Sequence, residues 1–224
     1  MKGIKNLTKF TLPIRPLHDY NKPTMKNLPT IRMATIADAP ALREIYLPYV
    51  RTTAVTFELE DPTLEDFTER VRKTLERYPY IVAEEDDEIV GYAYASAFRP
   101  RAAYLHSIET SIYMRMDYRG RGVGRRLYTA LAKLLVLQNV YNMEACIAHC
   151  EPADEYVPAT SRLFHERLDF KLIGKFNKCA HKFGRWYDMI WMEKILDDHV
   201  ADPEPFLPLP LVDKEKVDAV LAEA

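Results

Sequence analysis

A glycine-rich turn between a strand and a helix is the feature that most limits how this chain can fold. Residues 107–114 are predicted to form a strand, and glycine then stands at alternate positions, at Gly120, Gly122 and Gly124. From Val123 onward apolar residues recur at helical spacing. Such a turn leaves backbone N–H groups unpaired at the positive end of a helix dipole. The sequence therefore predicts a site for a phosphate or pyrophosphate group.

The spacing of this turn excludes two common nucleotide sites. A Walker loop needs Lys followed by Ser or Thr after its last glycine, but Arg125 and Arg126 follow Gly124. The dinucleotide fingerprint GxGxxG also fails, because glycine stands at every second position and the preceding strands are predicted to be antiparallel. A different phosphorylated ligand is expected.

One α/β domain is predicted over residues 30–196. Its first half favours antiparallel strands and its second half alternates strands with helices, so we expect a mixed, mostly antiparallel sheet flanked by helices. The expected strands cover 30–33, 80–83, 89–97, 107–114, 143–149, 171–176 and 187–194. Four helices are expected. The first starts after Asp38, which is its N-cap, the second covers 64–75, the third begins at 123, and the fourth covers 161–168.

Both ends of the chain differ in composition from this domain. Residues 1–29 are basic and interrupted by prolines, which predicts an irregular arm. Residues 197–224 form a proline-rich, acidic extension that ends in a short amphipathic helical segment around Val217. We expect this segment to dock either on the core or on a second subunit.

Composition limits the partners and the compartment. The net charge of −2 gives no bulk attraction to nucleic acid or to an anionic membrane. The apolar runs are far shorter than the roughly 20 residues of a membrane-spanning helix, and the first residues lack the apolar stretch of a secretory signal. We therefore expect a cytoplasmic protein without nucleic-acid or membrane partners. Cys146, Cys150 and Cys179 include no CxxC pair, which favours free thiols buried in strands over a disulfide framework or a metal site.

The turn itself resembles a known family. Arg119-Gly120-Arg121-Gly122-Val123-Gly124 is similar to the (Arg/Gln)-x-x-Gly-x-(Gly/Ala) pyrophosphate loop of the GNAT superfamily of acyl-coenzyme A dependent N-acetyltransferases. The resemblance implies the GNAT acyl-CoA N-acyltransferase fold, with acetyl-CoA as cofactor. The cofactor contacts that it implies are Ile112, Tyr113, Met114, Arg119, Gly120, Arg121, Gly122, Val123, Gly124, Arg125 and Ser161.

Within that superfamily, residues 31–194 resemble the phosphinothricin and methionine sulfoximine acetyltransferase branch. The segments that carry this likeness are Thr52–Glu58, Glu109–Tyr113, His165-Glu166 followed by Phe170, and Lys182–Asp188. The branch implies a small amino-acid-like amine as acceptor and a homodimer. The residues expected at the acceptor are Thr53, Val55, Phe57, Arg99 and Trp186, with Arg99 as a fork for a carboxylate. Core packing is the alternative for Phe57 and Trp186, and Arg99 is equally compatible with an ordinary surface arginine.

Two side chains are candidates for proton transfer. The attacking amine must be a free base, and Glu109 stands where the branch places its proposed general base. A base that acts through water is equally compatible, and the alternative role of Glu109 is an ion pair to a nearby Arg or binding of the substrate ammonium. His165 stands where a general acid would protonate the departing thiolate, and simple packing is its alternative role.

Two segments depart from the pattern of the branch. Residues 151–159 form a longer and more acidic loop, and the Asn that usually precedes the last helix is replaced near Thr160 and Ser161. Asp169 stands where the branch has a glycine that often adopts the left-handed conformation. Two other functions remain open from the sequence: a non-catalytic acyl-CoA-binding regulatory module, and an N-acetyltransferase that acts on peptide amino termini.

Overall fold

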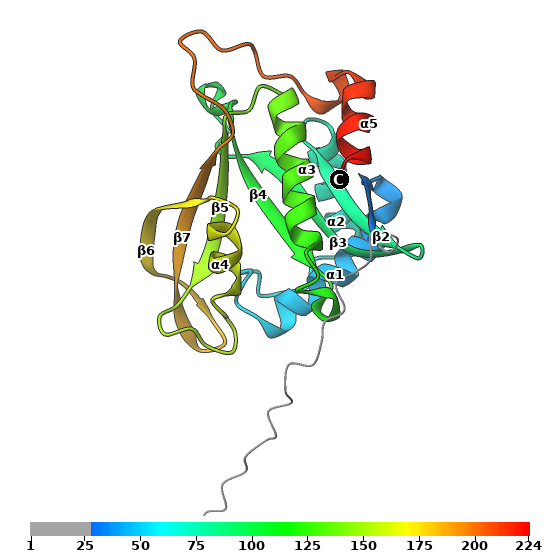
Figure 1. Ribbon diagram of the computed structural model, residues 1–224. Coiled ribbons are helices and arrows are strands. Elements are labelled where there is room, and N and C mark those ends of the chain that lie inside the picture. The colour runs from blue at the N-terminus through cyan, green and yellow to red at the C-terminus, as the bar shows by residue number, and fades with distance from the viewer. Residues whose placement is uncertain (1–27) are drawn as a thin grey trace, which may run out of the picture.

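A seven-stranded sheet forms the centre of the computed structural model, which describes residues 28–224 (Figure 1). The strand order is β1-β2-β3-β4-β5-β7-β6, and only the β4–β5 pair is parallel. The strands are β1 (Thr30–Met33), β2 (Tyr80–Glu85), β3 (Glu88–Ala97), β4 (Ser107–Met114), β5 (Asn142–His149), β6 (Lys171–Lys182) and β7 (Arg185–Ile195). The expected mixed, mostly antiparallel sheet is confirmed.

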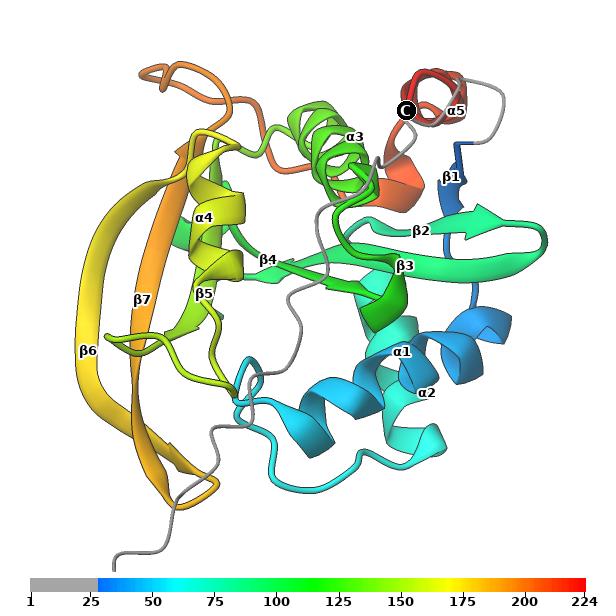
Figure 2. The ribbon, with the colours of Figure 1, turned by 60° about the horizontal axis from the view of Figure 1, so that its bottom comes forward.

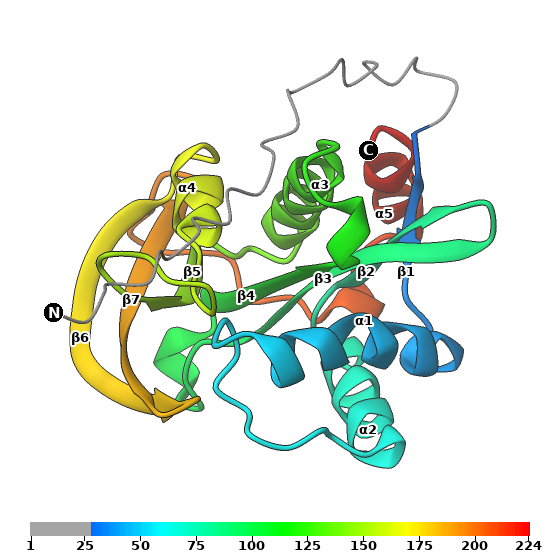
Figure 3. The same cartoon turned by 90° about the horizontal axis from the view of Figure 1, so that it is seen from below.

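Helices cover both faces of the sheet. They are α1 (Ala39–Thr52), α2 (Leu64–Leu75), α3 (Val123–Leu137), α4 (Thr160–Glu166) and α5 (Lys214–Ala222). Figure 3 shows α1 and α2 on one face and α3, α4 and α5 on the other. Within residues 28–224, no helix is both long enough and apolar enough to span a bilayer.

Each face of the sheet has its own apolar core. On the α3 face, Leu127 and Leu131 are fully buried against the strands. On the other face, Leu42 of α1 and Val71 of α2 are fully buried against β2 and β3. Burial of each such side chain contributes about 1.5–3 kcal/mol, so the helical spacing of apolar residues fixes which side of each helix meets the sheet.

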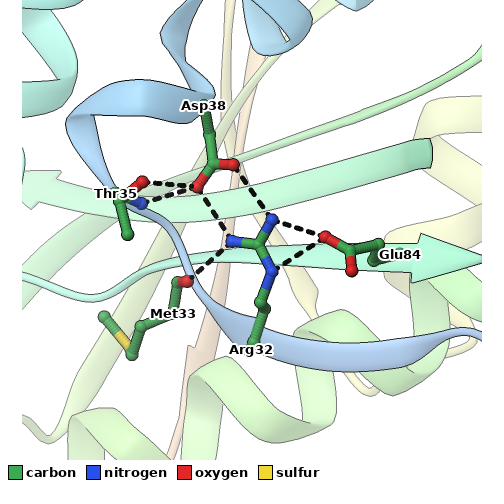
Figure 4. Close-up of polar contacts among 5 residues, drawn as sticks. All are labelled: Arg32, Met33, Thr35, Asp38 and Glu84. Carbon is green, nitrogen blue, oxygen red and sulfur yellow. Dashed lines mark hydrogen bonds and ion pairs between the residues drawn. The ribbon is translucent and has the colours of Figure 1, made fainter. Parts of the chain in front are cut away.

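Asp38 is the N-cap of α1 as predicted, but its side chain is engaged elsewhere. Asp38 occupies the N-cap position of α1, but its carboxylate makes no capping bond to that helix. Figure 4 shows that it receives two hydrogen bonds from Arg32, at 2.8 and 2.9 Å, and one from the backbone N–H of Thr35 at 2.7 Å. Arg32 also donates to Glu84 on β2. A charged partner therefore holds the carboxylate more strongly than the helix end does.

The hairpin of β6 and β7 is longer than predicted. Its strands were expected at 171–176 and 187–194, but they extend to Lys182 and start at Arg185. Register shifts between Leu172 and Gly174 and between Phe176 and Ala180 break the alternation of the β6 side chains, so the apolar pattern ends before the strand does.

The carboxyl-terminal extension docks on the core, one of the two expected places. Val217 of α5 is buried in the core cluster on the α3 face, and Lys133 of α3 pairs with Glu223 at 2.7 Å. The fully buried side chain of Gln138 donates to the carbonyl of Leu207 at 2.9 Å. Of the predicted arm over 1–29, residues 1–27 lie outside the described residues.

The cysteines are free thiols, but they are not all buried as expected. Cys146 and Cys179 are exposed and Cys150 is half-buried. Cys146 lies on β5 among the residues that line the cavity between β4 and β5, so the separation of the two strands leaves its side chain accessible. Among the described residues, no cluster of three or more His, Cys, Asp or Glu side chains could hold a metal ion.

Candidate active site

The two parallel strands β4 and β5 separate in the middle of the sheet. Their register pairs are Ser107–Asn142, Ile108–Met143 and Glu109–Glu144, and the pairing ends there. β4 stays paired to β3 as far as Met114, while β5 stays paired to β7 as far as His149. Figure 2 shows the two strands running apart, with α3 and α4 over the same face. Backbone groups that would bond across the sheet therefore point into an opening.

The alternation of the backbone shows which N–H groups of β4 point into this opening. The N–H of Arg115 donates to Val90 of the neighbouring β3 segment at 2.9 Å. In an antiparallel pair the direction alternates, so the N–H of Tyr113 also points to β3, and those of Ile112 and Met114 point toward β5. The Met114 N–H meets the Tyr49 hydroxyl at 3.2 Å, and this hydroxyl donates to the Met114 carbonyl at 2.6 Å. Three residues of β4 were expected to contact the cofactor: Ile112, Tyr113 and Met114. Ile112 presents its N–H to the opening, the N–H of Tyr113 points to β3, and the N–H of Met114 is already bonded to Tyr49.

The glycine-rich turn leads directly into α3. Gly120 and Gly122 have φ angles of 80° and 83°, in the left-handed region that favours glycine. Gly122 is the N-cap of α3 and has no side chain to satisfy the first N–H groups, so those of Val123, Gly124 and Arg125 lack helical partners. A Cβ on Gly124 would lie 3.3 Å from the Phe164 ring of α4. Glycine thus suits the backbone angles of the turn at Gly120 and Gly122, and at Gly124 it avoids a tight contact with α4.

The arginines of the turn divide into two groups. Arg119, Arg121 and Arg125 are exposed, and within residues 28–224 none of them pairs with a carboxylate. Arg126 instead points away from the turn and donates to the backbone carbonyls of Pro29, at 2.8 Å, and Ala224. Three guanidinium groups at the start of α3 therefore add positive charge at the expected pyrophosphate site, and Arg126 does not.

A cavity occupies the opening between β4 and β5. Its walls come from β4, β5, α3, α4, the loop after α1 and the loop before α4. The expected site residues that line it are Val55, Ile112, Tyr113, Ser161 and His165. The fold thus brings together residues that were assigned from the sequence to the cofactor, the acceptor and catalysis.

His165 is buried at one wall of this cavity and is bonded at both nitrogens. Its Nδ1 lies 2.8 Å from the carbonyl of Ser161, and its Nε2 lies 3.1 Å from the hydroxyl of Tyr128. Because a carbonyl only accepts, Nδ1 carries the proton and Nε2 is left as an acceptor. The single hydroxyl proton of Tyr128 is shared between Nε2 and the Thr110 hydroxyl. Burial lowers the pKa of His165 to about 4, so the imidazole is neutral at pH 7.

Glu109 lies at the point where the two strands separate. It is half-buried, and burial raises the pKa of its carboxyl group above the ordinary value, while the Arg99 guanidinium acts in the opposite direction. Glu109 was predicted to share one face of β4 with Tyr113, four residues further along the strand. The ring of Tyr113 packs 4.9 Å from that of Tyr46, so this face is the one that α1 covers. Thr110, on the opposite face, lies 3.3 Å from the Tyr128 hydroxyl on α3. Glu109 thus stands in the last register pair before the strands separate, next to the cavity but not among the residues that line it.

The remaining expected acceptor residues lie at different distances from the cavity. Thr53 donates its hydroxyl to the carbonyl of Tyr49 at 2.8 Å, and Phe57 packs beside the buried Ala54. Arg99 lies over the rings of Phe98 and Trp191, 4.3 and 5.3 Å from their centroids. Trp186 is 61% exposed on the β6–β7 hairpin. None of these four side chains lines the cavity.

Sequence reasoning missed three residues that shape this site. Tyr128 belongs to the buried side of α3, so its helical spacing marks it only as a core residue. Tyr49 also lies on a buried helix face. Val157 belongs to the loop that departs from the family pattern, where no motif predicts a contact. Only the tertiary fold brings these side chains to the opening.

Fold and site together define a class of enzyme. A splayed pair of parallel strands, a glycine-rich anion site at the start of the adjoining helix and a carboxyl group at the apex suit transfer from a diphosphate-bearing acyl carrier. A family model described as an acetyltransferase (GNAT) domain matches residues 31–191. The chain belongs to the GNAT acetyltransferase family, and it is an acyltransferase that uses acetyl-CoA.

Individual relatives agree with this assignment. A phosphinothricin N-acetyltransferase of Alcaligenes faecalis is 34% identical over 178 residues, which cover 75% of this chain and 83% of the relative. An L-methionine sulfoximine/L-methionine sulfone acetyltransferase of Pseudomonas paraeruginosa is 33% identical over 179 residues, which cover 78% and 98% of the two chains. A crystal structure of a phosphinothricin acetyltransferase from Sinorhizobium meliloti in complex with AcCoA matches with a TM-score of 0.73 at 33% identity, over 82% of this chain and 97% of that chain.

Proposed function

We propose that this protein transfers the acetyl group of acetyl-CoA to the primary amine of a small amino-acid-like acceptor, of the phosphinothricin or methionine sulfoximine type. The observation that carries the proposal is the opening between β4 and β5, which has Glu109 at its apex and the turn at Gly122 beside it. Residues 30–196 carry this activity, in agreement with the family match to residues 31–191.

The chain offers a complete set of cofactor contacts. The N–H groups of Val123, Gly124 and Arg125 bind the diphosphate, and the guanidinium groups of Arg119, Arg121 and Arg125 add charge. The Ile112 N–H, which points into the opening, binds the acyl carrier beside β4. When bound, acetyl-CoA supplies the thioester carbonyl that the amine attacks.

Glu109 acts as the general base. Its carboxylate takes the proton of the acceptor ammonium directly or through one water, which leaves a neutral amine to form the bond to the acetyl carbon. Burial raises the pKa of Glu109, which brings this pKa closer to the pH at which the enzyme works. Arg99, whose charge acts on Glu109, holds the acceptor carboxylate. Val55 borders the acceptor within the cavity, and Thr53, Phe57 and Trp186 border it from outside the cavity lining.

His165 has a positioning role in this proposal. A general acid at this position would need a second ring proton, which an imidazole with a pKa of about 4 does not hold at neutral pH. Its Nε2 instead fixes the hydroxyl of Tyr128 at 3.1 Å, and both side chains line the cavity. The departing thiolate therefore takes its proton from solvent or from the attacking nitrogen, which must lose one proton as the amide forms.

A thiol-release assay with product mass analysis tests the activity. Phosphinothricin, L-methionine sulfoximine and L-methionine sulfone are offered together with short peptides that have free amino termini. The proposal expects release of CoA and formation of an N-acetyl product with at least one of the free amino acids. Binding of acetyl-CoA without turnover of any amine would support a regulatory module instead, and turnover of peptides alone would support an amino-terminal acetyltransferase.

A homodimer is also part of the proposal. The edge strand β6 exposes Leu172, Ile173 and Phe176, each at least half exposed, and such a row on a sheet edge favours pairing with another copy. Light scattering should give twice the chain mass for the wild type and the single mass for Ile173→Asp. A monomeric wild type at micromolar concentration would refute this part.

We further propose that the protein works in the cytoplasm. The support is that all three of its cysteines are free thiols, two of them exposed, which suits a reducing compartment. Fractionation of cells that express the chain with a carboxyl-terminal tag should place it with cytoplasmic markers. Recovery in a secreted fraction would contradict this location.

A further inference from the structure

The loop between β5 and α4, residues 151–159, is fastened to the β6–β7 hairpin. The Asp154 carboxylate accepts the N–H groups of Tyr156 and Val157 at 2.9 and 2.7 Å through Oδ1. Its Oδ2 receives the Arg185 guanidinium at 2.9 Å and the Tyr187 hydroxyl at 3.1 Å. Four donors on one carboxylate hold the loop in a single position.

The same loop is also fastened to the segment after α1. The carbonyl of Tyr156 accepts the N–H of Ala54 at 3.0 Å, and the Tyr156 ring stacks on that of Phe183 with centroids 4.6 Å apart. Val157 is only 3% exposed and packs in a small buried cluster with Ala54, Ala148 and Tyr187. The loop thus connects the two segments that were expected to border the acceptor.

Two of these segments contribute apolar side chains to the cavity wall. Val55 after α1 and Val157 in the loop both line the cavity, and neither side chain offers a hydrogen-bonding group. A branched apolar side chain held from behind by a buried cluster cannot move aside at low cost. The space beyond Val157 is therefore closed to a longer substituent.

We propose that Val157 is a specificity-determining residue that limits the length of the acceptor side chain, and that Asp154 is the residue that positions it. This inference rests on the proposed function, because it concerns the acceptor end of the same cavity. The enzyme then accepts short amino-acid-like side chains and rejects homologues that extend by a few methylene groups.

The experiment measures kcat/KM for L-methionine sulfoximine and for its S-butyl homologue at saturating acetyl-CoA. Val157→Ala removes two methyl groups and should raise the ratio of long to short acceptor by about tenfold or more. Val157→Ile adds one methylene and should lower the same ratio. The KM for acetyl-CoA should stay unchanged in both variants.

Val71→Ala is the matched control, because Val71 is fully buried in α2 against the other core cluster. It removes the same two methyl groups and should lower stability without moving the acceptor ratio. Asp154→Ala should move the ratio in the direction of Val157→Ala, and Asp154→Asn, which keeps an acceptor for the two N–H groups, should restore most of the wild-type value.

The possible results distinguish the role of Val157 from the acetyltransferase activity itself. An unchanged ratio in active Val157→Ala and Val157→Ile variants would overturn the inference and leave the acetyltransferase function standing. A change in the KM for acetyl-CoA at a constant acceptor ratio would also overturn it, since Val157 would then border the cofactor. A wild type that acetylates neither compound nor any other free amino acid would overturn the proposed function and the inference with it.

Discussion

Glu109 and Glu144 form the last register pair between the parallel strands β4 and β5, and beyond them the strands separate. The two carboxyl groups differ in their surroundings. Glu109 is half-buried at the apex of the opening, whereas Glu144 is only 7% exposed and lies beside Glu193. The last register pair thus leaves one acid half-buried where the strands separate and the other buried on the sheet.

Glu109→Gln should lower kcat by about 10²- to 10⁴-fold, the usual contribution of a general base. Acetyl-CoA affinity should change little, because the backbone of β4 and α3 supplies the cofactor contacts. In the wild type, kcat/KM should fall as pH is lowered through a pKa above the ordinary value for a carboxyl group, and the variant should lose this acid limb. Initial rates between pH 5 and 9 measure both effects, with the exposed Glu204→Gln as control. Unchanged turnover in Glu109→Gln would remove this residue from catalysis.

Gly122→Val should weaken acetyl-CoA binding strongly. Its φ of 83° disfavours a residue with a Cβ, which costs about 1–2 kcal/mol, and the new side chain stands where the backbone must approach the diphosphate. Gly184→Val is the matched control, since Gly184 has a φ of 73° but lies in the β6–β7 turn. Both variants should lose similar stability on thermal unfolding, and only Gly122→Val should lose affinity. Equal affinities would show that the turn does not bind the cofactor.

Glu144→Gln should stabilise the fold at alkaline pH. Burial, together with the neighbouring Glu193, raises the pKa of Glu144 to about 7 from 4.5. The folded state thus favours the protonated form, and the wild type loses stability as pH rises from 4.5 through 7, by about 3 kcal/mol at 1.36 kcal/mol per pKa unit. Glutamine is always neutral, so the gain should be absent at pH 4 and largest at pH 8. Urea unfolding measures it, with Glu60→Gln as control, and an equal gain at pH 4 would contradict this cause.

His165→Gln should flatten the acid side of the stability profile. Burial lowers the pKa of His165 from 6.5 to about 4, so the unfolded chain takes up the proton first. The wild type should therefore lose about 3 kcal/mol more than the variant between pH 6.5 and 4. Urea unfolding across this range measures the difference, and the exposed His181→Gln should follow the wild type. If the stability of the variant changes with pH as steeply as that of the wild type, His165 takes up its second ring proton in the folded state as easily as in the unfolded chain.

The sequence allowed much of the fold to be predicted, because local patterns determine it. The strand at Ser107–Met114 and the helix that starts at Val123 follow from alternation, helical spacing and glycine placement, and both lie where predicted. Asp169, expected to adopt the left-handed conformation, has a φ of 68°. These features depend on residues near one another in the chain.

The acceptor side could not be predicted in this way, because long-range contacts build it. Val157 meets Ala54 about a hundred positions away, and no local pattern marks that contact. Asp38 shows the same limit on a smaller scale, since its capping role gives way to Arg32 on another element. The exposed Cys146 lines the cavity between β4 and β5, and strand alternation alone cannot show where a sheet opens.

Titration calorimetry with acetyl-CoA and with S-acetylpantetheine, which lacks the diphosphate, tests the central claim most directly. The account predicts that the wild type binds acetyl-CoA about 100-fold more tightly, because two charge-assisted contacts at the start of α3 are worth about 3 kcal/mol. It also predicts that Gly122→Val loses most of this preference. No binding of acetyl-CoA by the folded wild type, or equal affinity for both compounds, would contradict it.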